Sequence, residues 1–249
     1  MNIAIKTSQE SNIMRYAGRL LQDVQELLKK HISEGVSLLE LDRIAEERIL
    51  AAGAVPSFKG YQGFPKTLCT MINSEVVHGI PDNRQLQKGD LLSVDCGVYV
   101  QGFHADAAFS VIIGGEEAHP ERAKFSRCVR EALLAGCDAA RAGNRIGDIG
   151  AAIEHIVVRD GYSVCREYTG HGLGRELHED PFVYNYGTPK TGEKLVKGMT
   201  IAIEPIIASG SPRTKTLSDG WTVVTVDGRD ACQWEHCGVV TEKGFEIFA

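Results

Sequence analysis

The segment 91–111, LLSVDCGVYVQGFHADAAFSV, holds two apolar runs around the dipeptide Gln101-Gly102. Such a dipeptide is suited to a tight hairpin turn, so we predict strands at 91–100 and 103–113. A two-residue turn at 101–102 places Asp95 opposite Ala108 and Asp106 opposite a glycine at position 97. Both carboxylates then lie on one face as diagonal neighbours, about 7–8 Å apart. Two like charges at this distance need a bound cation or a shared proton.

Two further acids interrupt apolar runs in the second half of the chain. Glu204 lies in MTIAIEPII, before Pro205, and Glu235 lies in ACQWEHCGVV, so we predict strands at 200–208 and 231–240 that each contain an acid. An unpaired ionised carboxylate in a core is costly, so bound cations are the simplest explanation for four such acids. Any one of them alone also fits an edge strand with a wet face.

Histidines in glycine-rich segments add candidate metal ligands. The segment YTGHGLGRELHED holds His171 among three glycines, with His178 seven positions later, and NSEVVHGIPD holds His78. Glycines disfavour a helix and let the backbone approach a site closely. Four carboxylates with one or two imidazoles suit divalent Mn, Fe, Co or Zn. Each histidine taken alone also fits a structural or surface position.

Capping residues predict two helices early in the chain. Thr7, three residues before a glutamate, caps the first helix, which is predicted to end by Gly35. Ser37, also three residues before a glutamate, caps the second helix, which continues to Gly53. Helix, helix and strands therefore follow one another in the first half of the chain.

The second half repeats this order. Helices are predicted from Pro120 to Gly143 and from Gly143 to Gly161, and a shift of 108 positions aligns Gly35 with Gly143 and Gly53 with Gly161. Chance matching of two amphipathic helices is the alternative explanation. We predict an α+β fold with two pseudo-equivalent halves, about 1–118 and 119–249, in one domain, with helices on one face of a mostly antiparallel sheet.

Composition limits the classes of function. The 249 residues allow one large domain or two small ones, and 33 acidic against 27 basic residues give a net charge of −6, which disfavours nucleic-acid binding. Seven cysteines, an odd number without a CxxC spacing, argue against a disulfide framework or a structural zinc site, and favour a reducing compartment. No signal peptide or membrane-length apolar run is present, so we expect a cytoplasmic protein without membrane contact.

Five motifs together resemble type I methionine aminopeptidase, a dinuclear metallopeptidase with the pita-bread fold. They follow the order of that family over nearly the whole chain: NSEVVHGIPD (73–82), SVDCGVYVQGFHADAAFSV (93–111), YTGHGLGRELHEDP (168–181), AIEPI (202–206) and QWEHCGVV (233–240). The resemblance implies two divalent ions, with Co, Mn, Fe, Zn and Ni all compatible. It assigns Asp95 to one ion, His171 and Glu204 to the other, and Asp106 and Glu235 to both.

The resemblance also implies a reaction. A hydroxide activated by the two metal ions would attack the carbonyl after an N-terminal methionine, with a small second residue preferred. His78 and His178 would be catalytic histidines, and Glu204 the general base. The implied pocket for methionine is made by Phe58, Tyr61, Phe64, Cys69, Leu177 and Trp221, together with His78.

The expected partners are peptides and nascent chains with an N-terminal methionine. The ribosome is a further candidate partner, and we expect a monomer. Three residues depart from the family's usual pattern, namely Ala105, Leu177 and Cys237. None of them is an implied metal ligand. Leu177 is expected to loosen the roof of the pocket, and Cys237 to weaken a hydrogen bond behind the metal ligands.

Two other functions fit part of the pattern. A prolidase or aminopeptidase P relative would share the fold and the acids, although such relatives generally carry an additional N-terminal domain. A binding module without metal, built on the same fold, would have lost ligands, whereas all five ligand types are present here.

Overall fold

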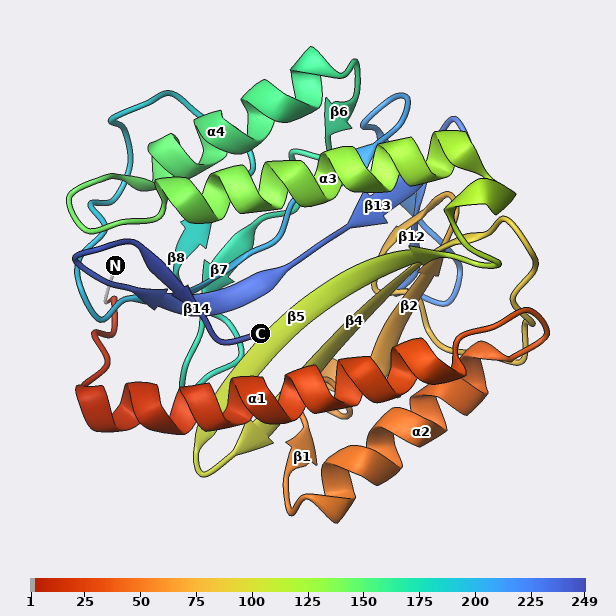
Figure 1. Ribbon diagram of the computed structural model, residues 1–249, viewed down its shortest axis with the longest axis horizontal. Helices are drawn as coiled ribbons and strands as arrows, with labels where there is room; N and C mark the ends of the chain where they lie inside the picture. Colours follow the sequence, from red (N-terminus) through yellow and green to blue (C-terminus); the bar gives the residue numbers. More distant parts are fainter. Residues whose placement is uncertain (1–2) are drawn as a thin grey trace.

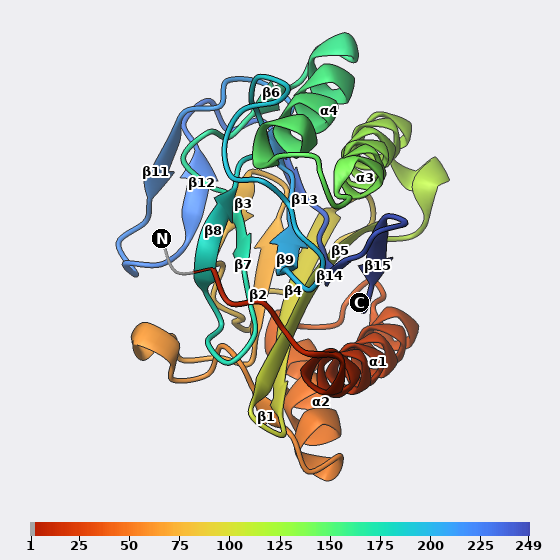
Figure 2. The same ribbon diagram turned by 90° about the vertical axis from the view of Figure 1, so that its left-hand side faces the viewer.

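In the computed structural model, which describes residues 3–249, helices cover one side of the molecule and β-strands form the other (Figure 1). Figure 2 shows this division from the side. The α-helices of this part of the chain are α1 (Ser8–His31), α2 (Leu38–Ala51), α3 (Pro120–Ala139) and α4 (Ile146–Arg159), with single 3-10 turns at Tyr61–Gly63 and Glu116–Ala118. None of the helices in residues 3–249 combines the length and apolar character needed to cross a bilayer.

Four sheets make up the strand side. The first contains β1 (Val55–Pro56), β2 (Leu68–Ile72), β4 (Leu91–Val100) and β5 (Phe103–Ile112), and the second has the order β13 (Ala231–Gln233), β10 (Ile206–Ala208), β6 (Ser163–Val164). The third has the order β11 (Thr214–Thr216), β12 (Val223–Thr225), β3 (Glu75–Val77). The fourth has the order β15 (Phe245–Ile247), β14 (His236–Val240), β9 (Thr200–Ile203), β7 (Gly170–Gly172), β8 (Glu179–Val183). Every strand pair among the described residues is antiparallel.

The β4–β5 hairpin has the predicted register. Asp95 pairs with Ala108 and Gly97 pairs with Asp106, so the two carboxylates project from the same face. The turn residues Gln101 and Gly102 both have positive φ, 53° and 85°, as a two-residue hairpin turn of the mirror-image type requires. The strands at 91–100 and 103–112 therefore differ from the prediction by one residue only.

The two predicted strands that carry glutamates are each interrupted at the acid. Glu204 and Pro205 separate β9 from β10, and Trp234 and Glu235 separate β13 from β14. At both interruptions the chain passes from the three-stranded β13-β10-β6 sheet to the five-stranded sheet, or the reverse. Pro205 has no N–H to donate to a ladder, and the N–H of Glu235 donates to the carbonyl of Ala108 on β5 at 3.0 Å. The prediction of continuous strands was wrong because the acids stand where the chain changes sheets.

The helices follow the predicted repeat. α2 and α4 both have 14 residues, and they begin at Leu38 and Ile146, which are 146 − 38 = 108 positions apart. α3 ends at Ala139, before the predicted limit: the N–H groups of Ala140 and Arg141 make short-range turns to Cys137 and Ala139, and those of Ala142 and Gly143 donate to other segments, at Thr241 and Leu195. The α+β class with helices on one face of antiparallel sheets is thus confirmed.

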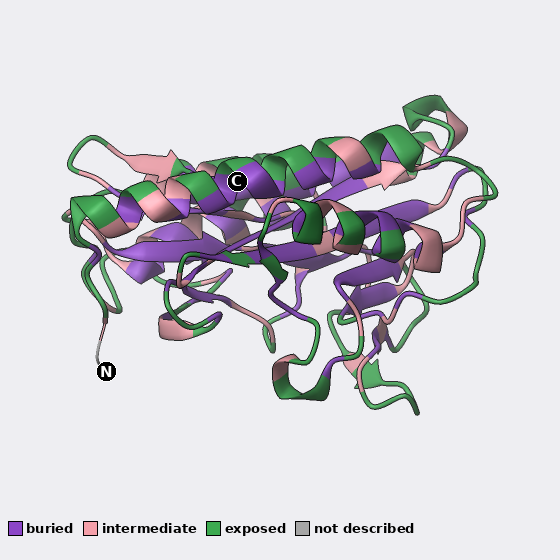
Figure 3. Cartoon of the chain, turned by 90° about the horizontal axis from the view of Figure 1, so that it is seen from below, coloured by how far each residue is buried: buried purple, intermediate pink, exposed green. Residues whose placement is uncertain are grey.

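Each helix pair covers its own apolar core. α1 and α2 bury Leu21 and Leu41 against β4 and β5, and α3 and α4 bury Leu133 and Ile153 against β9 and β14. Figure 3 shows that the helices keep one side exposed, whereas the strands beneath them are largely buried. Burial of these apolar faces is the main source of stability for such amphipathic helices.

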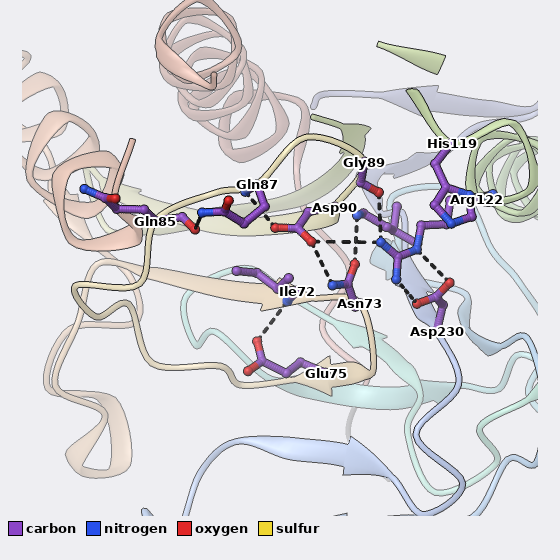
Figure 4. Close-up of polar contacts among 11 residues, drawn as sticks. Ile72, Asn73, Glu75, Gln85, Gln87, Gly89, Asp90, His119, Arg122 and Asp230 are labelled. Atoms are coloured by element: carbon purple, nitrogen blue, oxygen red, sulfur yellow. Dashed lines mark hydrogen bonds and ion pairs between the residues drawn. The ribbon is translucent and has the colours of Figure 1, made fainter. Parts of the chain in front are cut away.

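A polar cross-link joins the two halves at one end of the sheets (Figure 4). Arg122, on α3, donates to both carboxylate oxygens of Asp230 at 2.9 Å and to the carbonyl of Gly89 at 2.8 Å. Its guanidinium also lies 3.9 Å from Asp90, whose carboxylate accepts the side-chain N–H of Asn73 at 2.9 Å. Asp90 lies just before β4 and Asp230 just before β13, so Arg122 connects the starts of two strands that lead toward the acids.

Candidate active site

All the candidate site residues of the sequence line one cavity of about 280 Å³. Asp95 comes from β4, Asp106 from β5 and His171 from β7, whereas Glu204 and Glu235 come from the two strand interruptions. The hairpin register brings the two aspartates to one face, and the changes of sheet turn the two glutamates toward them. Residues from 95 to 235 therefore meet at one point, although they are far apart in the chain.

The acids and the imidazole are close enough to share a cation. The Nε2 atom of His171 lies 3.6 Å from Oε1 of Glu204 and 3.9 Å from Oδ2 of Asp106. Ligand atoms of Asp106, His171 and Glu235 all lie within 4.8 Å of one another, and these three residues are buried. This set of oxygen and nitrogen donors matches the preferences of divalent transition-metal ions.

Hydrogen bonding orients His171 as a metal ligand. Its Nδ1 atom lies 2.9 Å from the carbonyl oxygen of Gly172, which can only accept, so Nδ1 carries the proton and Nε2 keeps its lone pair. Burial lowers the pKa of the His171 imidazole to about 3, helped by the nearby imidazoles of His178 and His104. The ring is therefore neutral at physiological pH and directs its free nitrogen toward the acids.

Without a cation the four acids are electrostatically unfavourable. Burial raises the pKa of the Asp95 carboxyl to about 7. Burial, followed by repulsion from neighbouring carboxylates, raises the pKa values of Asp106, Glu204 and Glu235 well above their ordinary range. Buried oxygens of Asp95, Asp106 and Glu235 have no hydrogen-bond partner. Unpartnered acceptors that also repel one another are what a divalent cation would satisfy, so the residues fit such a group.

Two further imidazoles stand at the mouth of the cavity. Nδ1 of His178 lies 2.7 Å from the hydroxyl of Tyr61, and the His178 ring centroid lies 4.3 Å from that of His171. His78 has a positive φ of 59° and lies edge-on to Trp221, with ring centroids 6.3 Å apart. Partial loss of water around the rings lowers the pKa of both imidazoles, and His78 adds to the effect on His178. Both rings can thus act as neutral hydrogen-bonding groups.

The other end of the cavity is apolar. A small cluster next to the acids consists of the following side chains: Phe58, Phe64, Cys69, Met71 and Leu177, with Tyr61 and Trp221 packed against it. Phe64 and Trp221 meet edge to face with ring centroids 5.1 Å apart. An unbranched thioether side chain suits such an aromatic recess, since sulfur–aromatic contacts are favourable.

Sequence reasoning missed several wall residues, of which Gln233 is the most informative. Gln233 is 1% exposed, and its Nε2 donates to Oε2 of Glu204 at 3.3 Å, while its Oε1 has no partner. An amide two positions before Glu235 in an apolar run was the available signal. The remaining missed wall residues are Gln62, Val77, Glu167, Tyr168, Thr169 and Ile206.

Cys237 lies behind the acids. Its sulfur accepts the backbone N–H of Asp106 at 3.5 Å, and burial raises the pKa of the thiol to about 12. Cys232 instead directs its sulfur toward the hydroxyl of Ser110 at 3.4 Å and does not line the cavity. Both thiols are buried and protonated at neutral pH, which makes them poor nucleophiles.

Known metallopeptidases are similar to this chain over almost its whole length. Residues 12–242 match the family model of metallopeptidase family M24. Methionine aminopeptidase 1 of Bacillus subtilis is 46% identical over 245 residues, 98% of this chain and 98% of that protein. The crystal structure of methionine aminopeptidase from Rickettsia prowazekii aligns with a TM-score of 0.96 and 36% identity, and covers 99% of both chains. A cavity of this kind belongs to metal-dependent peptidases, and the chain belongs to metallopeptidase family M24.

These relatives confirm the resemblance to methionine aminopeptidases and the pita-bread fold. Membership of a metallopeptidase family and the buried cluster of Asp106, His171 and Glu235 together imply that the protein uses divalent metal. A prolidase from Pyrococcus horikoshii has a TM-score of 0.78 at 22% identity, and this chain covers 62% of its length. That likeness concerns the fold alone.

Proposed function

We propose that this chain removes the N-terminal methionine from nascent proteins and peptides, with a preference for a small second residue. The observation that carries the proposal is the shared cavity, in which a cation-binding cluster adjoins an apolar aromatic recess. A methionine side chain in the recess places the following carbonyl beside the acids. Burial of that side chain contributes about 1.5–3 kcal/mol to binding. The identity to methionine aminopeptidases supports the same assignment.

Two divalent ions are proposed, held by five side chains. Asp95 would hold one ion, His171 and Glu204 would hold the other, and Asp106 and Glu235 would contribute to both. Co, Mn, Fe, Zn and Ni are all compatible with these carboxylate and imidazole donors. When bound, such ions lower the pKa of a water molecule and polarise a carbonyl.

The protein's own groups complete the reaction. The Tyr61 hydroxyl lies 2.7 Å from Nδ1 of His178, and we assign the hydroxyl as the donor. His178 then carries its proton on Nε2, from which it can be donated to the oxygen of the scissile carbonyl as negative charge develops there. Glu204 serves as the proton acceptor for the attacking water. His78, which lines the cavity beside Trp221, would contact the scissile amide.

We also propose the domain organisation, oligomeric state, location and partners of the protein. We assign all of residues 1–249 to one catalytic domain, active as a monomer in the cytoplasm. Its macromolecular partners are nascent chains and the ribosome that carries them. The net charge of −6 argues against direct binding to nucleic acid.

A titration of metal-free protein tests the activity. Release of methionine from Met-Ala-Ser is measured while Mn, Fe or Co is added, with N-acetyl-Met-Ala-Ser and a Xaa-Pro dipeptide as comparison substrates. We expect cleavage of Met-Ala-Ser alone. Equal rates on the acetylated peptide would reject the requirement for a free N-terminus, and cleavage of the Xaa-Pro dipeptide alone would favour a prolidase.

Variants test the assignment of the shared ligands. Asp106→Ala and Glu235→Ala are expected to remain folded and to lose metal-dependent hydrolysis. Glu131→Ala, which removes an exposed acid paired with Arg159, is the matched control and should keep it. Turnover retained in either cavity variant would overturn the ligand assignment.

A further inference from the structure

The loop 173–178 contributes two side chains to the lining of the cavity. It connects β7, which contains His171, to β8, which begins at Glu179. Leu177 and His178 lie at the end of this loop and line the cavity. The position of the His178 ring therefore depends on how firmly the loop end and Glu179 are held.

A buried ion pair fixes that end of the loop. The ammonium group of Lys6 pairs with Oε2 of Glu179, and the two side chains are only 4% and 13% exposed. The other oxygen, Oε1 of Glu179, accepts the backbone N–H groups of Arg175 at 2.8 Å and Glu176 at 3.2 Å. One carboxylate thus closes the loop on itself, and Lys6 supplies the opposite charge that makes its burial tolerable.

Lys6 is itself held in place from both sides. Its backbone N–H donates to the carbonyl of Gly198 at 2.9 Å, and the neighbouring Ile5 forms a β-bridge with Met199. A Cβ atom on Gly174 would lie 2.3 Å from Cε of Lys6, so the loop backbone packs directly on the lysine stem. Figure 2 shows the N-terminal segment crossing the ends of β7 and β8 before it enters α1.

A second contact joins the same two segments at the surface. The guanidinium of Arg175 donates to Glu10 of α1 at 2.8 Å and lies over the ring of Phe103 at 4.8 Å. The Arg175 side chain is 65% exposed, so water and salt screen this pair. The buried Lys6 contact is shielded from this screening.

We propose that Lys6 is a positioning residue, which acts through Glu179 to hold the 173–178 loop so that His178 faces the reacting carbonyl. The inference rests on the proposed aminopeptidase function, because it assigns His178 a place in that reaction. Lys6 is not one of the residues that line the cavity. Its loss therefore affects turnover through the geometry of the loop, since small displacements of a catalytic group are costly.

Three variants test this role. Lys6→Met removes the charge and keeps the length of the stem, Lys6→Arg keeps the charge, and Glu179→Gln removes the partner's charge while keeping an oxygen for the two backbone N–H groups. Arg15→Met is the matched control, because Arg15 pairs with Glu246 at 2.5 Å and ties α1 to β15 away from the cavity. Both kcat and KM on Met-Ala-Ser are measured, together with amide hydrogen exchange of residues 173–178.

We expect Lys6→Met and Glu179→Gln to lower kcat at least about tenfold with little change in KM, and Lys6→Arg to restore most of it. Hydrogen exchange of the 173–178 amides should rise about tenfold in the first two variants and stay unchanged in Arg15→Met. If Lys6→Met fails to fold, Glu179→Gln carries both measurements. Unchanged kcat, or a loss that Arg15→Met shares, would overturn the proposal.

The exchange measurement separates this inference from the proposed function. It needs no substrate, so a wild-type protein that releases no methionine would reject the proposed function and leave the loop measurement interpretable. Unchanged exchange of the 173–178 amides in Lys6→Met would reject the anchoring role, whatever the activity.

Discussion

Metal-free protein should gain stability when Asp95 is replaced by asparagine, and the gain should grow with pH. Burial raises the pKa of the Asp95 carboxyl from 3.8 to about 7 in the folded protein. The folded state therefore binds this proton more tightly than the unfolded state does. The resulting stabilisation is complete below the unfolded pKa and is lost as the pH rises through the folded pKa. Asp95→Asn has no proton to lose and escapes this penalty.

The expected size follows from the shift. A difference of about 3 pKa units, at 1.36 kcal/mol per unit, gives about 4 kcal/mol between about pH 4 and pH 7. For a protein of this length each kcal/mol changes Tm by ~2–4 °C, so the Tm of Asp95→Asn should exceed that of wild type by ~8–16 °C near neutral pH. Below about pH 4 the two proteins should unfold at similar temperatures.

Thermal unfolding of chelator-treated protein across this pH range measures the effect. The quantity to compare is the difference in Tm between Asp95→Asn and wild type at each pH. This difference is used because buried histidines change the stability of both proteins with pH in the direction opposite to Asp95. The pKa of His171 is lowered to about 3 in the folded state, so both proteins lose folding stability as the pH falls below about 6.5. Asp138→Asn, at an exposed position of α3, serves as control. A Tm difference that is constant with pH, or that shrinks toward neutral pH, would refute the reasoning. Addition of Mn should reverse the order, because only wild type keeps all its ligands.

Three further substitutions test the apolar recess, the contact between Tyr61 and His178, and the cross-link made by Arg122. Gly97→Ala places a Cβ 2.7 Å from that of Ser57 and 2.9 Å from the Phe58 ring, so both residues must shift. KM for Met-Ala-Ser should then rise at least about fivefold with kcat retained, and an unchanged KM would mean that this shift does not reshape the recess. Tyr61→Phe removes the 2.7 Å hydrogen bond to His178 and should lower kcat roughly 2- to 12-fold in steady-state assays; full activity would remove Tyr61 from the mechanism. Arg122→Met should lower the free energy of unfolding by about 1–3 kcal/mol in urea titrations, whereas a change within about 0.5 kcal/mol would match a surface pair.

Local patterns were sufficient to predict the parts of the fold that depend on neighbouring residues. The hairpin register follows from a two-residue turn, and the start of α1 follows from Thr7 and Glu10, whose capping box is present. The interruptions at Glu204 and Glu235 could not be read from the chain, because they depend on which sheet each neighbouring strand joins. Two-residue strands such as Val55–Pro56 were missed for the same reason, since only their partners make them strands.

The site could be predicted further than the fold because its residues are chemically unusual for their positions. An aspartate in an apolar strand requires an explanation whatever the tertiary structure is, so Asp95 and Asp106 stand out from the sequence alone. Gln233 and Lys6 do not. A single amide or lysine is common at the surface, and only tertiary contacts reveal that these two are buried at 1% and 8% exposure. Sequence patterns therefore identify acids placed in apolar strands better than they identify the polar residues that contact or position the site.

The chain changes sheets at Glu204 and at Glu235, and these two changes explain both how the acids meet and why their burial is unfavourable. The side chain of a glutamate within a regular strand would project from one fixed face of the sheet, whereas Glu204 and Glu235 stand between strands and are free of that constraint. Their release from the ladder lets them converge on Asp95 and Asp106, which the hairpin register holds on one face. The cost of this convergence is a set of buried acids, of which Asp95, Asp106 and Glu235 have oxygens without a hydrogen-bond partner. Divalent cations would offset that cost, so metal binding should contribute to folding as well as to catalysis. The pH-dependent gain in Asp95→Asn measures the cost of ionising one of these buried acids when no metal is present.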